Sequence, residues 1–181
     1  MDMSQVKEIG RAYGFDDVAI VPGKVTTNPD QSSTVFTIDG ISTSTPILAA
    51  AMDAAVSSSF AREMDRLGGL AVMNLEGIQT KYTDPNDVLE QIIAAPTEDV
   101  TALLQKLYAA PVREQLIGTR IEEIKSKGAK CAVSVTPANA KRFALPATDA
   151  GADVVLVQST VTTARHISKS AESLRFPELL E

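Results

Sequence analysis

The sequence predicts an α/β fold built on a parallel β-sheet. Apolar runs fall at residues 46–52, 70–74, 131–135 and 153–157, and stretches with helical start and stop signals lie between them. Unbroken apolar runs of this length are typical of strands that are covered on both faces. Strands that alternate with helices favour parallel pairing with right-handed crossovers.

Composition narrows the class of protein further. The chain has 181 residues, of which 44% are hydrophobic and 22% are charged, as expected for one globular domain. Its net charge of −6 disfavours nucleic acids and membrane surfaces as partners. The single cysteine, Cys131, excludes an internal disulfide, and no signal peptide or membrane span is recognisable. We therefore expect a cytoplasmic protein.

The first 44 residues are expected to form an N-terminal segment that ends in a small hairpin. Residues 34–38 alternate polar and apolar side chains, Asp39-Gly40 is a strong signal for a two-residue turn, and Ile41 resumes the apolar pattern. We expect this hairpin to act as a lid or plug for the domain that follows, over residues 45–181.

The first strand of that domain has an unusual end. In the segment TPILAAAMDAAVSSSF, residues 45–60, bulky side chains give way to Ala49–Ala51 directly before Met52 and Asp53. Small side chains at this point would let a flat ligand or a loop approach the backbone. The alternative is that the alanines face other small residues in a tightly packed core.

Helices are predicted from their termini. Their expected starts are, in order, Phe60, Asp84-Pro85, Thr97, Thr119 with Glu122 as a capping box, Thr136-Pro137 and Thr162. Expected C-terminal stops are Gly68-Gly69, Gly128 and Gly151, and Pro111 separates two of the helices.

Two architectures fit four alternating strands: an open doubly wound sheet and part of an eight-stranded barrel. No Gly-x-Gly-x-x-Gly follows any of the strands, which disfavours the open dinucleotide-binding sheet. We therefore predict the (β/α)8 TIM barrel fold, of which this chain covers about the first four βα units. In such barrels the chemistry lies where strands end. The strand ends here are Met52-Asp53, Asn74-Leu75-Glu76, Thr136-Pro137 and Gln158-Ser159-Thr160.

Three segments resemble successive blocks of the IMP dehydrogenase and GMP reductase family, in the same order. They are YGFDDVAIVPGK, TPILAAAMDAAVSSSFAREMDRLGGLAVMNLEG and AGADVVLVQST. The resemblance spans nearly the whole chain and implies an eight-stranded α/β barrel. It also implies a purine nucleotide oxidoreductase, in which a cysteine attacks C2 of a purine 5′-monophosphate and a nicotinamide cofactor, NADPH or NAD, exchanges a hydride with that carbon. Family members form tetramers or octamers, so a homo-oligomer is expected.

The resemblance implies a substrate role for two residues and a missing nucleophile. Met52 matches the methionine that lies against the purine, and the adjacent Asp53 is expected either to contact the substrate or to brace its loop. The family nucleophile belongs to a Gly-Ser-x-Cys-Thr loop, which does not occur here, and Cys131 is expected to be a buried thiol. We therefore expect the nucleophile beyond Glu181 and expect these 181 residues to be inactive alone. No metal site is expected.

Five residues are expected to contact the cofactor. Asn74 and Glu76 lie where IMP dehydrogenases carry histidines, and Gln158 lies where they carry an aspartate that binds the nicotinamide ribose. Ser159 and Thr160 match a serine pair that touches the cofactor, and they fit equally well as hydroxyl caps of the next helix.

The reaction expected from the resemblance is GMP reduction. IMP dehydrogenases of the family carry a regulatory pair of domains between the second and third strands, whereas residues 75–130 contain only capped helices here. This favours the small IMP-dehydrogenase-related branch and an NADPH-dependent conversion of GMP to IMP and ammonia. The alternatives are an IMP dehydrogenase that forms XMP with NAD, a non-catalytic nucleotide-binding half barrel, and an unrelated phosphate-handling barrel enzyme with Glu76 as base.

Overall fold

The structure is a computed structural model that describes residues 10–159 and 175–180. The chain divides into two units, Met1–Ser33 and Thr34–Glu181. The described part of the first unit is exposed and contains two short 3-10 turns, η1 over Phe15–Asp17 and η2 over Pro29–Gln31. All strands and α-helices that the structure describes belong to the second unit.

The second unit begins with the predicted hairpin. Strands β1, Phe36–Ile38, and β2, Ile41–Thr43, pair antiparallel. The turn residues Asp39 and Gly40 have φ angles of 46° and 80°, as a two-residue turn of the favoured hairpin type requires. The hairpin is therefore confirmed, and its role as a lid or plug stays a prediction.

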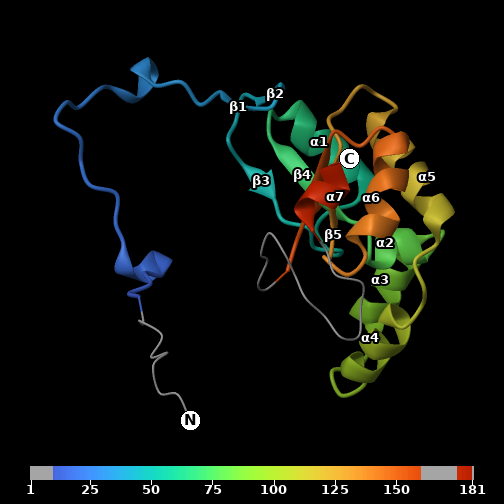
Figure 1. Ribbon diagram of the computed structural model, residues 1–181. Helices are drawn as coiled ribbons and strands as arrows, with labels where there is room; N and C mark the ends of the chain where they lie inside the picture. Colours follow the sequence, from blue (N-terminus) through green and yellow to red (C-terminus); the bar gives the residue numbers. More distant parts are fainter. Residues whose placement is uncertain (1–9, 160–174, 181) are drawn as a thin grey trace, which may run out of the picture. The chain divides into compact units, whose positions relative to one another are not determined.

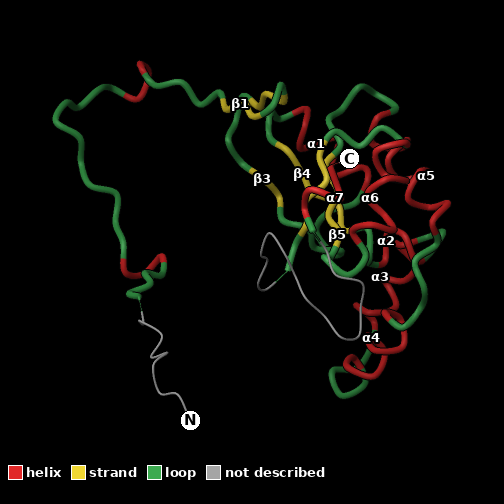
Figure 2. The backbone as a smooth tube through the Cα atoms, viewed as in Figure 1, coloured by secondary structure: helices red, strands yellow, loops and turns green. Residues whose placement is uncertain are grey.

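A four-stranded parallel sheet follows, as predicted. It consists of β3 (Leu48–Ala49), β4 (Leu70–Asn74), β5 (Ala132–Val135) and β6 (Val154–Val157), in the spatial order β3-β4-β5-β6 (Figure 2). Each strand is thus a neighbour of the next one along the chain, which is the order that a βα barrel requires.

The first strand of this sheet is shorter than predicted. We expected residues 46–52, but only Leu48 and Ala49 pair with β4. The chain turns directly afterwards, because Met52 N donates to Ala50 O and Met52 O accepts from Ala55 N and Val56 N. The three alanines therefore differ in environment: Ala49 packs against the main core, Ala50 is exposed, and Ala51 packs against a small apolar cluster at the end of the sheet.

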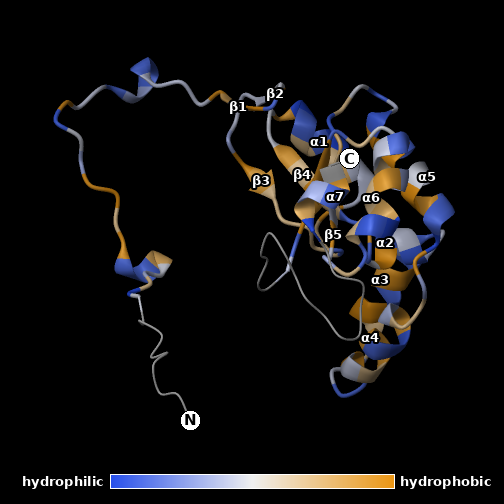
Figure 3. Cartoon of the chain, viewed as in Figure 1, coloured by the Kyte–Doolittle hydropathy of each residue, from blue (hydrophilic) through white to orange (hydrophobic). Residues whose placement is uncertain are grey.

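Helices cover one face of this sheet. These are α1 (Ser58–Arg66), α5 (Glu114–Lys125) and α6 (Ala140–Asp149), and α7 (Phe176–Leu180) packs on α6 (Figure 1). Their apolar side chains meet those of the strands in the main core, around Met73, Val133 and Ile121. Strands β3 and β4 are accordingly coloured as hydrophobic in Figure 3. No helix in the described ranges is both long and apolar enough to cross a lipid bilayer.

The segment between β4 and β5 contains three further helices. They are α2 (Ile78–Lys81), which was not predicted, α3 (Pro85–Ala94) and α4 (Val100–Tyr108). Helix α3 begins as expected, since the Asp84 side chain accepts hydrogen bonds from Asn86 N and Asp87 N.

Two predicted helix starts in this segment are wrong. The helix expected from Thr97 begins at Val100, after a turn that Pro96 O closes by accepting from Asp99 N and Val100 N. Thr119 lies inside α5 and donates to Gln115 O, so it does not form a capping box with Glu122. A third helix, α6, starts at Ala140, later than the predicted Thr136-Pro137, and the helix expected near Thr162 falls outside the described residues.

Candidate functional site

The carboxyl ends of the four parallel strands surround an open hollow of about 420 Å³. Its lining comes from all four strand ends: Ala51, Asn74, Ser134, Val135, Thr136, Gln158 and Ser159. None of these side chains is charged. The hollow lies where active sites of βα barrels are built.

The register of the sheet explains why polar groups gather there. Asn74, the last residue of β4, lies beside Ser134 of β5, and the chain leaving β6 is fixed because Gln158 N donates to Val135 O at 2.8 Å. Below this polar layer, on the same face of the sheet, Val72 and Ala132 pack together with Ala51. The hollow thus has an apolar floor and a rim of amides and hydroxyls.

Three of the predicted cofactor residues meet at this hollow. Asn74, Gln158 and Ser159 all line it, although more than 80 positions separate the first from the other two. The Met52 side chain, in the turn next to Ala51, is 59% exposed. Thr160 lies outside the described residues.

Asp53 is placed as a brace and not as a lining residue. It is 9% exposed, and its carboxylate accepts hydrogen bonds from Asn74 Nδ2 at 3.3 Å, Ile78 N at 3.2 Å and Tyr108 Oη at 2.5 Å. Gly77 makes room for it, because a Cβ added there would lie 1.9 Å from Asp53 Oδ1. Asp53 therefore ties the turn after β3 to the turn after β4.

Tyr108 was missed by the sequence analysis. It is the last residue of α4 and lies 55 positions from Asp53, and no local pattern marks it. Partial burial of the side chain, which is 41% exposed, and the hydrogen bond to the Asp53 carboxylate raise the pKa of the Tyr108 hydroxyl above its ordinary value. The hydroxyl is therefore a protonated donor to Asp53 at neutral pH.

Glu76 also braces a turn. Its carboxylate accepts hydrogen bonds from the backbone N and the hydroxyl of Thr136 and, at 2.6 Å, from Asn139 Nδ2. Glu76 does not line the hollow; it holds the turn that leads from β5 into α6. Its backbone N–H donates to Asn74 Oδ1 at 2.9 Å, which leaves the Asn74 side chain held at both ends of its amide.

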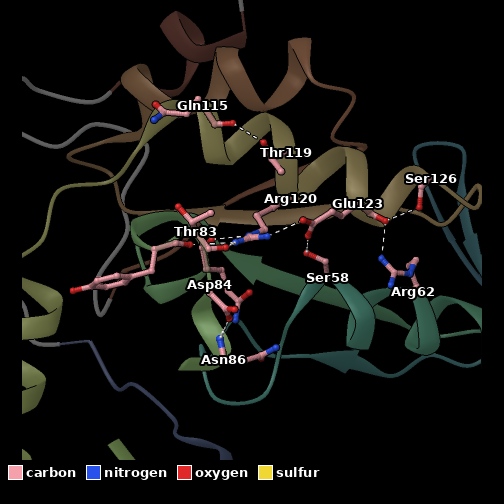
Figure 4. Close-up of polar contacts among 12 residues, drawn as sticks. Ser58, Arg62, Thr83, Asp84, Asn86, Gln115, Thr119, Arg120, Glu123 and Ser126 are labelled. Carbon is pink, nitrogen blue, oxygen red and sulfur yellow. Dashed lines mark hydrogen bonds and ion pairs between the residues drawn. The ribbon is translucent and has the colours of Figure 1, made fainter. Parts of the chain in front are cut away.

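A second polar network on the helical side holds α2 in place. Arg120 of α5 is 7% exposed and donates to Gln79 O, Tyr82 O, Thr83 O and Glu123 Oε1 (Figure 4). It thereby satisfies carbonyl groups at the C-terminal end of α2. Because the first N–H of α2 is a donor to Asp53, this network supports the site indirectly.

Cys131 is a buried thiol, as predicted. It is 0% exposed, and burial together with the nearby Asp153 carboxylate raises the pKa of its thiol to about 12. Within the described ranges, no three His, Cys, Asp or Glu side chains are grouped so that they could hold a metal ion.

Comparisons with known proteins agree with this geometry. The sequence model of the IMP dehydrogenase / GMP reductase domain matches residues 12–177. An uncharacterized oxidoreductase of Mycolicibacterium smegmatis is 36% identical over 169 residues, which are 91% of this chain and 45% of that protein. The inosine-5′-monophosphate dehydrogenase of Methanocaldococcus jannaschii is 34% identical over 74 residues, 41% of this chain and 15% of that enzyme.

A solved structure shares the fold. The crystal structure of an IMP dehydrogenase/GMP reductase-like protein from Corynebacterium glutamicum superposes with a TM-score of 0.80 at 32% identity, over 92% of this chain and 46% of that one. The barrel prediction is thereby confirmed, and the chain spans about half the length of the mycobacterial oxidoreductases that it matches. The chain belongs to the IMP dehydrogenase / GMP reductase family.

Proposed function

We propose that the full-length protein is a cytoplasmic, homo-oligomeric GMP reductase. It would convert GMP, NADPH and protons to IMP, ammonium and NADP⁺. Family membership supports an oxidoreductase that acts on a purine 5′-monophosphate with a nicotinamide cofactor. The observation that carries the finer assignment is the uncharged rim of the hollow, where Gln158 lies at the position of the aspartate expected from IMP dehydrogenases.

The lining residues fit a nicotinamide nucleoside. Gln158 and Asn74 offer amide donors and acceptors, and Ser159 offers a hydroxyl, all on the rim of one hollow. These groups can hydrogen-bond a ribose or a carboxamide. When bound, the cofactor supplies the hydride, and the residues of this chain hold its uncharged parts at the strand ends.

The purine substrate is assigned to the side of the hollow next to β3. Met52 presents an exposed, polarizable thioether on which a purine ring can lie. Asp53 and Asn74 fix the turn that carries it, so the base would meet a preorganised surface. The attacking cysteine is assigned to the half of the protein that this chain does not contain, because Cys131 is buried with a raised pKa.

The amide at position 158 favours GMP reduction over IMP oxidation in this proposal, together with the plain helices in place of a regulatory insert. A carboxylate accepts a stronger hydrogen bond from a ribose hydroxyl than an amide does, by about 1–2 kcal/mol. This corresponds to about tenfold in cofactor affinity. Gln158 therefore weakens one strong contact expected of NAD-dependent IMP oxidation.

The test is a steady-state assay of the full-length protein. We expect a larger kcat/KM for GMP with NADPH than for IMP with NAD. Gln158→Asp should move the ratio of the two kcat/KM values toward IMP oxidation by about tenfold, whereas Gln115→Glu, which changes an amide to a carboxylate on α5, should leave it unchanged. A larger kcat/KM for IMP oxidation in the parent enzyme would replace this assignment by an IMP dehydrogenase.

A further inference from the structure

The helices α3 and α4 form an appendage that reaches back to the candidate site. They pack against each other and against α2. Nevertheless Tyr108, the last residue of α4, donates the shortest of the three hydrogen bonds that the Asp53 carboxylate accepts. The contact joins a helix outside the sheet to the turn that carries Met52.

The end of α4 is held firmly enough to place this hydroxyl. Lys81, only 9% exposed, donates through Nζ to Tyr108 O at 3.0 Å and to Ala110 O at 2.6 Å. A small apolar cluster that includes Ile78, Val88 and Leu107 fills the space between α2, α3 and α4.

Asp53 connects the Tyr108 hydroxyl to two groups of the candidate site. On one side it is covalently next to Met52, and on the other it fixes Asn74, which lines the hollow. The carboxylate occupies the space that a Cβ at position 77 would fill, so this placement requires Gly77. Loss of the tyrosine donor would leave Asp53 Oδ2 with its longer hydrogen bond from Ile78 N, so the carboxylate could tilt or bind water and would hold the Asn74 amide less firmly.

We propose that Tyr108 is a positioning residue of the nucleotide site, acting through Asp53 on Met52 and Asn74. This inference rests on the proposed function, because it concerns how the same site holds its purine nucleotide. It assigns to the α3–α4 appendage the task of ordering the turn after β3. Tyr108 touches no substrate in this proposal.

Two tyrosine variants separate positioning from simple docking of the helices. Tyr108→Phe in the full-length protein removes the hydroxyl that reaches Asp53. Tyr82→Phe removes a hydroxyl that donates to Leu107 O and leaves both Lys81 hydrogen bonds to the end of α4 in place. We expect the KM for GMP to rise about three- to tenfold in Y108F, with kcat within about twofold, and both constants to stay at the parental values in Y82F. Urea unfolding should show similar losses of stability in the two variants.

A spectroscopic measurement tests the proposal without activity. The NMR signals of the Met52 methyl group and the Asn74 side-chain amide should shift in Y108F and stay in place in Y82F. Unchanged signals in Y108F, or equal changes in both variants, would overturn the positioning role. If the parent protein turns over no purine nucleotide while these signals shift as expected, the proposed function is wrong. The structural connection from Tyr108 through Asp53 to the turn after β3 is then still supported.

Discussion

Replacing Arg120 by methionine should destabilise the protein strongly. Arg120 is 7% exposed and makes hydrogen bonds of 2.7 to 3.2 Å to three backbone carbonyls and to Glu123 (Figure 4). Methionine keeps much of the apolar stem but leaves the buried Gln79 O and the Glu123 carboxylate without this partner. The Glu123 side chain is 39% exposed and can be hydrated, so the main cost is the buried Gln79 O left unpaired together with the lost charge-assisted bond, about 2–4 kcal/mol in all. Tyr82 O and Thr83 O belong to less buried residues that water can reach, so they add little.

The assay is urea unfolding of the parent and of R120M, followed by far-UV circular dichroism. We expect a lower midpoint with an unchanged slope, equivalent to a loss of about 2–4 kcal/mol. Arg66→Met is the matched control, because Arg66 also pairs with a glutamate three residues away, but the two side chains are 67% and 55% exposed. R66M should leave the urea midpoint nearly unchanged. A loss below about 1 kcal/mol in R120M, or equal losses in both variants, would refute the reasoning.

Two further predictions concern Cys131 and Asp153. Burial raises the pKa of the Cys131 thiol to about 12. At about pH 8 the folded protein should therefore react with a thiol reagent only as fast as it unfolds. Fast labelling of the native state would contradict this. Burial opposes ionisation of Asp153, but hydrogen bonds from Lys125 and from Cys131 N outweigh it and hold the pKa of Asp153 below its ordinary value. The stability that ionised Asp153 contributes is therefore complete above the unfolded pKa of about 3.9 and is lost as the pH falls through the lower folded pKa. Asp153→Asn should accordingly lose less stability than the parent on acidification. Urea midpoints measured from about pH 6 to about pH 2 would test this.

The strands and the hairpin could be predicted because their signals are local. An apolar run between glycine or proline residues specifies a buried strand wherever it pairs, and Asp39-Gly40 supplies two adjacent residues that tolerate a positive φ. Helix starts were less reliable. Thr119 followed by Glu122 matches a capping box, but a threonine hydroxyl inside a helix can also donate to the carbonyl four residues before it, as Thr119 does to Gln115 O.

The candidate site was predictable in part for the same reason. Strand ends are local features, so Asn74, Gln158 and Ser159 could be assigned to one edge of the sheet once the strands were parallel. The hydrogen bond from Tyr108 to Asp53 could not be predicted, because it joins residues 55 positions apart through the packing of α4 on α2. The tertiary structure places Asp53 inward, where it braces its turn, one of the two roles expected of it from the sequence.

The two acidic residues at the strand ends determine what the hollow can bind. The Glu76 carboxylate is engaged by Thr136 and Asn139, and that of Asp53 by three donors, so both act on neighbouring turns. The polar atoms left on the rim belong to amides and hydroxyls, and no lining side chain is cationic. A phosphate group would remain uncompensated there, whereas an uncharged base, carboxamide or ribose could satisfy its hydrogen bonds. We therefore expect the described half of the site to hold the neutral parts of its ligands, and their phosphates to be bound by residues outside this hollow.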